Sequence, residues 1–274
     1  MSSQPSWYVH GTAPEEQFRL SRLNDLMNDS TLAELKLAPG MRVVDFGCGL
    51  AQLTRRMAHV TGVGVVGIER SAEQIAEAVR QARDAGDEAR VDLRAGDVMA
   101  PPLAADEWGA FDLAHARFVL EHVPDPLGVV KQMVRAVKPG GRIALADDDH
   151  EQLRLFPEPA GFGPVWHAYM RTYDRAGNDP YVGRRLVQLL YEAGAEPVRN
   201  TQVFFGSCAG QPSFAAFVEN AAQILEGARE ATIAAGALDP VMFEDAVAAL
   251  RGWGERPDAA IWFTMPFAEG RRPK

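Results

Sequence analysis

Short apolar runs alternate with helical stretches through the first half of the chain, and this alternation limits the possible folds more than any other feature. Runs rich in Val, Leu, Ile and Phe indicate strands at residues 42–45, 64–69, 91–94, 111–115 and 142–146. Apolar residues at helical spacing between these strands indicate helices, for example at residues 50–59 and 71–86. Ser71, with Gln74 three residues later, is the expected N-terminal cap of the second of these helices. Strands that alternate with helices in units of roughly 30 residues form parallel sheets, because a parallel connection needs a long crossover. The pattern predicts a doubly wound α/β fold.

This alternation is interrupted after residue 149. Residues 150–182 are rich in aromatic residues, Pro and Gly, and residues 211–256 contain two helical stretches. A helix at 183–193 and strands at 197–205 and 260–266 complete the sheet. We expect a three-layer, Rossmann-like, seven-stranded and mostly parallel sheet, with helical insertions at about 150–182 and 211–256 that form a cap over the active site. The expected regions are an N-terminal helical lid (1–37), a cofactor-binding core (38–149), and the rest of the sheet with the cap (150–274).

Charged residues and glycines stand at the carboxyl ends of the predicted strands. Asp45 precedes a Gly-Cys-Gly turn after the first strand, and Glu69 ends the second. Asp97 follows the third strand, and His115-Ala116-Arg117 stands at the end of the fourth. In open parallel sheets, ligands bind beyond these strand ends, near the point where the strand order switches. Each feature alone is a weak signal, but four features in order predict a ligand site at this edge.

The residue types at this edge favour a cationic nucleoside over a dinucleotide. Glu69 can accept both hydroxyls of a ribose, which suits any adenosine cofactor. The dinucleotide pattern G-x-G-x-x-G fails, because Gln52 stands at the third glycine position. Asp45 would repel a pyrophosphate and attract an ammonium or sulfonium group, and Asp97 can accept from an adenine amino group. Three carboxylates around one cleft therefore favour S-adenosylmethionine.

Five sequence blocks resemble those of class I S-adenosylmethionine-dependent methyltransferases. In chain order they are Val43-Val44-Asp45-Phe46-Gly47-Cys48-Gly49, Val66-Gly67-Ile68-Glu69, Ala95-Gly96-Asp97-Val98, Leu120-Glu121-His122-Val123-Pro124-Asp125-Pro126 and Lys138-Pro139-Gly140-Gly141. The blocks span about residues 43–146, with a weaker likeness to about residue 200, and they resemble the branch that includes ubiquinone/menaquinone-biosynthesis methyltransferases and many natural-product enzymes. Ala51 departs from the pattern, since most of the family has a third glycine there. The resemblance implies a Rossmann-like fold, S-adenosylmethionine as cofactor and methyl transfer to a small molecule.

The resemblance also implies how the methionine end of the cofactor is held. Gly47 and Gly49 would line this end, and Asp45 would face its ammonium directly or through water. Arg117 stands where the family usually has residues near the methionine portion. The N-terminal stretch resembles a lid that closes over the cofactor in related enzymes, and two of its residues are expected near the carboxylate: Tyr8 and Arg22.

The adenosine end of the cofactor is expected at the second and third strands. By the same resemblance, Glu69 would hold the ribose, with the Arg70 backbone beside the adenine. Asp97 would bind the adenine amino group, and the Val98 amide would bind a ring nitrogen.

Several histidines can act as the catalytic base. Methyl transfer is an in-line displacement, so the protein mainly aligns the reactants, but a hydroxyl or amine acceptor also needs its proton removed. Histidine is the usual base near neutral pH. His122, in the shared block, and His167, in the aromatic insertion, are the candidates, with His150 as a further histidine and Tyr173 and Glu121 as helpers.

Three consecutive acids, Asp147, Asp148 and Asp149, follow the fifth strand and precede His150. Such a run offers oxygen ligands to a divalent metal. A loop in which one acid orients the acceptor is the favoured interpretation, so no metal is assigned.

Composition narrows the class of substrate. The formal net charge of −9, without a basic stripe, disfavours a nucleic-acid partner. The chain has neither a run of 18 apolar residues nor an N-terminal secretion pattern, which favours the cytoplasm over a membrane. The aromatic insertions suggest an apolar or ring-bearing small molecule. We expect a monomer or homodimer.

Three alternatives stay open on the sequence. They are a methyltransferase that acts on RNA or protein, an NAD(P)-dependent oxidoreductase on a similar sheet, and a non-catalytic module that binds the cofactor. The acidic balance disfavours the first alternative, and the missing third glycine disfavours the second.

Overall fold

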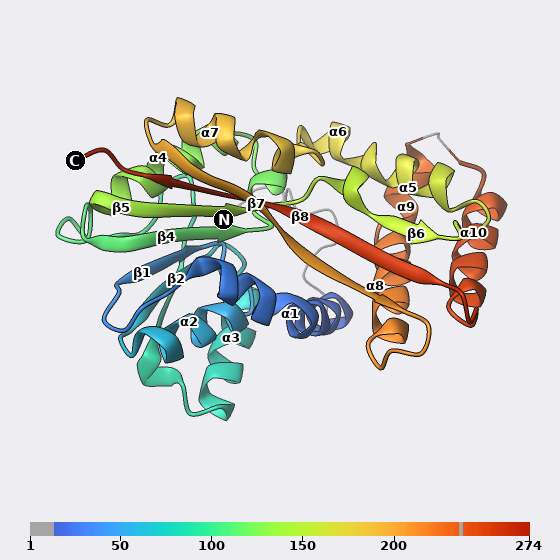
Figure 1. Cartoon of the computed structure of the whole chain (residues 1–274), viewed down its shortest axis with the longest axis horizontal. Helices are drawn as coiled ribbons and strands as arrows, with labels where there is room; N and C mark the ends of the chain where they lie inside the picture. Colours follow the sequence, from blue (N-terminus) through green and yellow to red (C-terminus); the bar gives the residue numbers. More distant parts are fainter. Residues whose placement is uncertain (1–13, 236–237) are drawn as a thin grey trace. The chain divides into compact units, whose positions relative to one another are not determined.

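The computed structural model describes residues 14–235 and 238–274, which form two compact units (Figure 1). Unit 2 comprises Met27–Asp149, Tyr181–Val203 and Met265–Lys274. The described part of unit 1 comprises residues 14–26, 150–180, 204–235 and 238–264. The two units interleave along the chain. The expected division into lid, core and cap stays a prediction.

Five parallel strands of unit 2 lie in the order β3-β2-β1-β4-β5. Their bounds are β1 Val43–Phe46, β2 Val65–Glu69, β3 Val91–Ala95, β4 Phe111–Arg117 and β5 Val137–Ala146. All four residues of β1 are buried, as expected for a central strand that is covered on both faces. The strand order switches between β1 and β4, where Asp45 and His115 are register partners. Open parallel sheets bind ligands at this switch point.

Helices cover both faces of the sheet in unit 2. Helices α2 (Gln52–Thr61) and α3 (Ala72–Asp84) lie on one side, and α4 (Pro126–Ala136) and α7 (Leu186–Glu192) lie on the other (Figure 1). Ser71 caps α3 as predicted, because its hydroxyl accepts a hydrogen bond from the Gln74 amide at 3.1 Å. The α4 side of the sheet packs an apolar core that includes Phe46 and Leu145, both fully buried.

Unit 1 is mainly helical. Helix α1 (Pro14–Leu35) begins in unit 1 and ends in unit 2. Wholly in unit 1 lie one strand, β6 Arg154–Phe156, and the α-helices α5 Phe162–Met170, α6 Thr172–Ala176, α8 Phe214–Gly227, α9 Arg229–Ala234 and α10 Pro240–Trp253. Aromatic rings form much of its core, and the Trp166 and Tyr169 ring centroids are 5.1 Å apart. The aromatic residues of the predicted insertion therefore pack against one another.

Two long strands pass through both units, β7 (Glu196–Cys208) and β8 (Ala260–Arg271). In unit 1 the start of β8 pairs antiparallel with β6, and in unit 2 its end pairs antiparallel with β5. Strand β7 also pairs with β8. The prediction of a Rossmann-like, mostly parallel sheet is confirmed. The sheet has eight strands, one more than expected, because β6 lies within the stretch assigned to the cap.

Four 3₁₀ helices complete the described elements: η1 Glu88–Arg90, η2 Leu120–His122, η3 His150–Gln152 and η4 Val182–Arg185. Among the described residues, no helix combines the length and apolar character that crossing a membrane requires.

Candidate functional site

The glycine turn after β1 is fixed by hydrogen bonds and by close packing. The Gly47 and Cys48 amides both donate to the Ile68 carbonyl, at 2.8 and 2.9 Å. Gly47 has a φ of +72°, and a Cβ on it would lie 2.4 Å from Cγ2 of Val119. Only glycine fits this position, because it tolerates the left-handed backbone and leaves room for the neighbouring side chain. The glycine requirement expected from the sequence therefore has an internal cause.

Ala51 also adopts a left-handed conformation, with a φ of +55°, at the N-cap of α2. This is the position where the related family usually has glycine. A left-handed alanine costs roughly 1–2 kcal/mol relative to glycine, apart from packing. The departure from the family pattern therefore carries backbone strain at the edge of the site.

Glu69 joins the glycine turn to the end of β2. One carboxylate oxygen accepts from the Gly49 amide at 3.1 Å, and the other accepts from the Ser71 amide at 2.8 Å. Burial raises the pKa of Glu69, and the amides of Ser71, Gly49 and Arg70 oppose this shift. A carboxylate has about four lone-pair directions, so one stays open for a ligand hydroxyl beside these three amides.

Asp97 lies in the turn after β3, as the sequence predicts. Its Oδ1 accepts from the Met99 amide at 2.9 Å, and the preceding Gly96 amide donates to the Glu69 carbonyl at 2.9 Å. Asp97 is half-buried and Val98 is buried. These bonds hold the β3 turn against the tip of β2, so Glu69 and Asp97 belong to one polar edge.

Asp45 is buried and binds two side chains. Its Oδ2 accepts from the Thr54 hydroxyl of α2 at 2.6 Å, and its Oδ1 lies 2.7 Å from Nδ1 of His115 on β4. His115 is fully buried, and its Nε2 has no hydrogen-bond partner among the described residues. A buried polar atom in this condition is costly unless a ligand or an internal water satisfies it.

Arg117 extends the same polar cluster along β4. Its guanidinium donates to the Thr31 hydroxyl at 3.0 Å and to Oδ1 of Asn28 at 2.9 Å, both from the second half of α1. Burial lowers the pKa of Arg117 to about 10, and the Asp45 charge opposes this shift. Nδ2 of Asn28, a fully buried residue, has no partner in the described part of the chain.

The other residues expected at the cofactor are placed differently. Arg22 is exposed in unit 1, with its guanidinium carbon 5.8 Å from the Phe18 ring centroid. Arg70 is exposed beside Glu69, which suits the backbone role expected of it. Tyr8 lies outside the described residues. These three assignments stay predictions.

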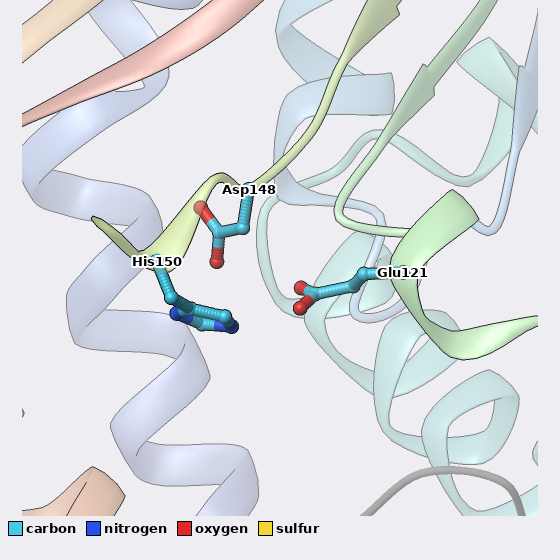
Figure 2. Close-up of side chains that lie close together, drawn as sticks. All are labelled: Glu121, Asp148 and His150. Carbon is cyan, nitrogen blue, oxygen red and sulfur yellow. The ribbon is translucent and has the colours of Figure 1, made fainter. Parts of the chain in front are cut away.

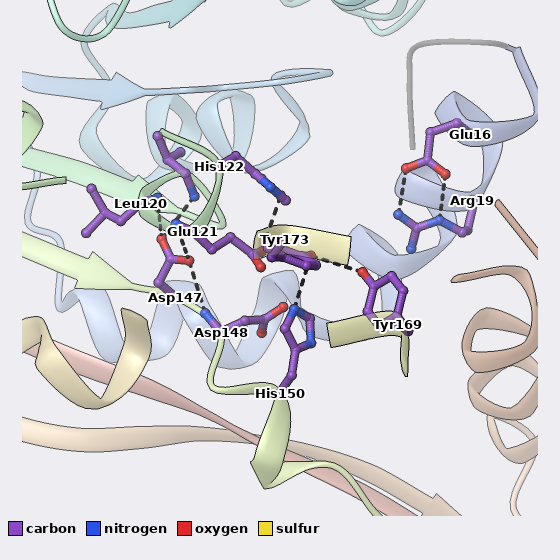
Figure 3. Close-up of polar contacts among 11 residues, drawn as sticks. Glu16, Arg19, Leu120, Glu121, His122, Asp147, Asp148, His150, Tyr169 and Tyr173 are labelled. Carbon is purple, nitrogen blue, oxygen red and sulfur yellow. Dashed lines mark hydrogen bonds and ion pairs between the residues drawn. The ribbon is translucent and has the colours of Figure 1, made fainter. Parts of the chain in front are cut away.

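The loop after β4 is organised by Asp147. Its carboxylate accepts from the amides of Val119, Leu120 and Glu121 at 3.0, 2.7 and 3.4 Å, and from that of Asp148 at 3.1 Å (Figure 3). Burial raises the pKa of Asp147 to about 6, and these amides oppose the shift. These hydrogen bonds fix the backbone of η2, which carries Glu121 and His122.

Glu121 and His122 form a pair within η2. Nε2 of His122 lies 3.3 Å from Oε1 of Glu121, which is buried, whereas His122 is partly exposed (Figure 3). A carboxylate next to an imidazole can orient the ring. His122, Asp45 and Glu69 all belong to unit 2.

The acids of the run after β5 have separate environments. Asp147 binds the loop described above, and Asp149 accepts two hydrogen bonds from Arg184, at 3.0 and 2.6 Å. Figure 2 shows Asp148 facing Glu121, and oxygens of these two carboxylates lie within 4.8 Å of each other. Asp147 and Asp149 thus have protein partners that hold the loop.

His167 and the other aromatic residues of the insertion lie in unit 1. His167 is exposed, and its Nδ1 lies 2.7 Å from the Gly163 carbonyl. Nε2 of His150 lies 3.2 Å from the Tyr173 hydroxyl, which is 3.0 Å from the Tyr169 hydroxyl (Figure 3). These three side chains form a buried hydrogen-bonded chain in the core of unit 1.

Sequence reasoning missed three polar residues of the buried cluster, Asn28, Thr31 and Thr54, and it gave no role to His115 at the end of the fourth strand. Each interrupts an apolar surface, as Thr54 does between Leu53 and Met57 on the inner face of α2. Polar residues at core-facing positions are rarely buried without partners. A polar residue at a core-facing position of a predicted helix or strand is therefore the sequence signal that could have identified these residues.

Comparisons with known proteins identify the family of the chain. A family model described as a methyltransferase domain matches residues 19–200. The chain is 30% identical over 251 residues to 27-O-demethylrifamycin SV methyltransferase from Amycolatopsis mediterranei (strain S699), covering 90% of this chain and 85% of the relative. It is 39% identical over 131 residues to a ubiquinone biosynthesis O-methyltransferase from Ralstonia nicotianae, covering 47% of this chain and 52% of that relative. The chain thus spans about half the length of the second relative.

A solved structure shares the fold. It is geranyl diphosphate C-methyltransferase from Streptomyces coelicolor A3(2), in complex with Mg²⁺, geranyl diphosphate and S-adenosyl-L-homocysteine. The TM-score is 0.56 at 15% identity, with 92% of this chain and 80% of the other covered. This likeness shows a shared fold, while the relatives above confirm the expected resemblance to small-molecule methyltransferases of cofactor biosynthesis and natural-product chemistry.

Proposed function

The chain belongs to the methyltransferase domain family, and from this premise we propose that it transfers a methyl group from S-adenosylmethionine to a hydroxyl oxygen of a small molecule. One observation carries the choice of cofactor. Asp45, Glu69 and Asp97 lie at the tips of three neighbouring strands, around a turn that only glycine can form at Gly47. A cluster of carboxylates at such an edge favours a cationic nucleoside.

The residues present fit this cofactor. Glu69, at the tip of β2, would accept from the ribose, and Asp97 with the Val98 amide suits the adenine edge. Asp45, Gly47 and Gly49 would hold the methionine end, with Arg117 on the same face of the sheet. The cofactor supplies a methyl group already activated on a sulfonium, so this chain contributes alignment and charge.

We infer that His122 takes the proton of the acceptor hydroxyl, with Glu121 holding its ring. The 3.3 Å contact between them and their position in unit 2 support this choice over the exposed His167 of unit 1. We expect His122→Gln to lower kcat by roughly 100-fold or more, as loss of a general base does, with little change in S-adenosylhomocysteine affinity. His59→Gln, at an exposed histidine paired with Asp87, is the matched control. A comparable loss in His167→Gln instead would move the base to unit 1.

The acceptor class follows from the relatives and the charge of the chain. The relatives methylate a rifamycin precursor and act in ubiquinone biosynthesis, so a phenolic, hydroquinone or polyketide hydroxyl is the proposed acceptor. The net charge of −9 favours such a molecule over RNA. A cytoplasmic location and a monomer or homodimer stay part of this proposal.

Calorimetry followed by a methyl-transfer assay tests the proposal. The purified chain should release heat on binding S-adenosylhomocysteine, and mass spectrometry should detect a methylated product from a panel of phenols, hydroquinones and polyketide alcohols. Thermal stabilisation by NADH alone would favour an oxidoreductase. Methylation of only tRNA or protein would favour a macromolecular substrate. Cofactor binding without turnover on any acceptor would favour a non-catalytic module.

A further inference from the structure

The polar cluster beneath the glycine turn contains opposite charges on neighbouring strands. Asp45 on β1 and His115 on β4 are register partners, and Arg117 stands two residues further along β4. Side chains two residues apart on a strand point to the same face, so Asp45 and Arg117 are diagonal neighbours on one face of the sheet. The two groups interact electrostatically: burial lowers the pKa of Arg117, and the nearby charge of Asp45 raises it. An α-amino acid end also carries two opposite charges, on one carbon.

We infer that this cluster recognises the amino-acid end of the cofactor in two halves: His115 and Thr54 orient Asp45 toward the ammonium, while Asn28 and Thr31 orient Arg117 toward the carboxylate. The inference rests on the proposed function, because it concerns the same cofactor. It assigns His115, Thr54, Asn28 and Thr31 as positioning residues. All six residues belong to unit 2.

The first half depends on the geometry of the Asp45 carboxylate. Thr54 and His115 bind different oxygens, at 2.6 and 2.7 Å, so the plane of the carboxylate cannot rotate without breaking one contact. A carboxylate offers about four lone-pair directions, and two stay open for an ammonium. Two donors also offset part of the cost of burying the group. His115 therefore stabilises Asp45 and sets the direction in which it accepts.

The second half depends on α1. Two neutral acceptors, the Thr31 hydroxyl and Oδ1 of Asn28, bind two different nitrogens of Arg117 and fix the plane of its guanidinium. A fixed guanidinium can bind a carboxylate through two parallel hydrogen bonds. The buried Nδ2 of Asn28 and Nε2 of His115, each without a partner among the described residues, add two polar atoms that a ligand or an internal water would satisfy.

Three ligands separate the two halves by calorimetry. S-adenosylhomocysteine carries both charges, its decarboxylated analogue keeps only the ammonium, and 5′-methylthioadenosine has neither. Thr54→Val and His115→Leu should each lower the affinity for the first two ligands by the same factor. We expect this factor to be about tenfold, or about 1.4 kcal/mol, as for the loss of one charge-assisted contact. Both should leave 5′-methylthioadenosine within twofold. Asn28→Leu and Thr31→Val should weaken S-adenosylhomocysteine alone.

Matched variants guard against a general loss of structure. His115→Asn keeps an amide donor for Asp45 and should restore most of the affinity that His115→Leu loses. Thr61→Val removes a buried hydroxyl from the other end of α2, where it binds only backbone carbonyls, and should change nothing. Equal weakening of 5′-methylthioadenosine, or an effect of Thr61→Val equal to that of Thr54→Val, would overturn the inference. A wild-type chain that binds none of the three ligands would contradict the proposed function as well.

Discussion

Glu69 shows how one residue can couple cofactor binding to pH. Burial raises its pKa, and three backbone amides only partly oppose this. A raised carboxyl pKa means that the neutral form is already populated at a pH where an exposed glutamate is still ionised. Ribose hydroxyls donate more strongly to an ionised carboxylate than to a neutral one. Cofactor affinity should therefore fall as the pH drops through the raised pKa of Glu69.

The variant Glu69→Gln tests this coupling. We expect it to weaken S-adenosylhomocysteine and 5′-methylthioadenosine equally, by roughly 10- to 100-fold, the loss of about 1.5–3 kcal/mol for hydrogen bonds to a charged group. Its affinity should no longer fall at acidic pH. Glu73→Gln, an exposed acid in the first turn of α3, is the matched control. Calorimetry across the acidic range measures both effects, and an unchanged pH dependence in Glu69→Gln would contradict the assignment.

The sequence places individual residues along the chain but does not give their partners. Asp45, Glu69 and Asp97 could be predicted at the site, because each follows a recognisable strand and all strand tips meet at one edge. The partners of Asp45 lie 9 and 70 positions away and depend on how α2 and β4 pack. The strain at Ala51 was equally hidden, because its small side chain does not predict a left-handed backbone.

At the scale of elements, the turn after β1 is locked to the loop after β4. Gly47→Ala should be destabilised by its positive φ and by the 2.4 Å approach to Val119. Gly40→Ala isolates the first cost, since Gly40 has a φ of +83° and nothing within 4 Å of its added Cβ. We expect Gly40→Ala to lower the free energy of unfolding by about 1 kcal/mol, and Gly47→Ala by about 1–3 kcal/mol more.

Chemical denaturation with a double-mutant cycle checks this. In the Gly47→Ala background, Val119→Ala should restore the part of the free energy of unfolding that is lost to the close contact. It should not restore the part that is lost to the positive φ, so the two substitutions should show a favourable interaction energy. Equal costs for Gly47→Ala and Gly40→Ala would show that the contact with Val119 relaxes freely.

The loop after β4 also depends on the ionisation of Asp147. Its folded pKa of about 6 lies above that of an unfolded aspartate. The carboxyl therefore contributes stability that is fully present below the unfolded pKa, about 4, and is lost as the pH rises through 6. Asp147→Asn, a permanently neutral isostere, should gain stability relative to the wild type between pH 5 and pH 7. Urea denaturation at both values measures this, and an unchanged difference between the variant and the wild type would mean that the four amides keep Asp147 ionised.

The boundaries of helices and strands could be predicted where the hydrophobic periodicity is strong. They could not be predicted where pairing with a neighbouring strand sets the ends of a strand. The strands and helices between residues 43 and 136 follow their hydrophobic patterns. Strand β5 was expected from Arg142, yet it begins at Val137, across a Pro-Gly-Gly stretch that indicates a turn. Pairing with β4 extends it, with an irregular register between Phe111 and Leu113. Strand β6 has three residues, too few to show the alternation that marks a strand.

At the scale of the whole molecule, the two units could not be predicted from chain order. The sequence divides naturally at residues 37 and 149, whereas α1, β7 and β8 each pass from one unit to the other. Hydrophobic patterns report which side of an element is buried but not against which other element. The described residues proposed for the cofactor nevertheless fall in unit 2, apart from Arg22, and the aromatic core of the insertion falls in unit 1.

This division predicts that the two units respond separately to core substitutions. Trp166→Ala removes a buried indole from unit 1 and should lower the free energy of unfolding by about 3–5 kcal/mol, yet leave S-adenosylhomocysteine affinity within twofold. Met57→Ala removes a fully buried side chain from α2 in unit 2, and should lower stability by about 2–5 kcal/mol and weaken the ligand too. Calorimetry and denaturation on the two variants measure this. The ligand stabilises only the structure that binds it, so a tenfold affinity loss in Trp166→Ala would mean that unit 1 completes the cofactor site.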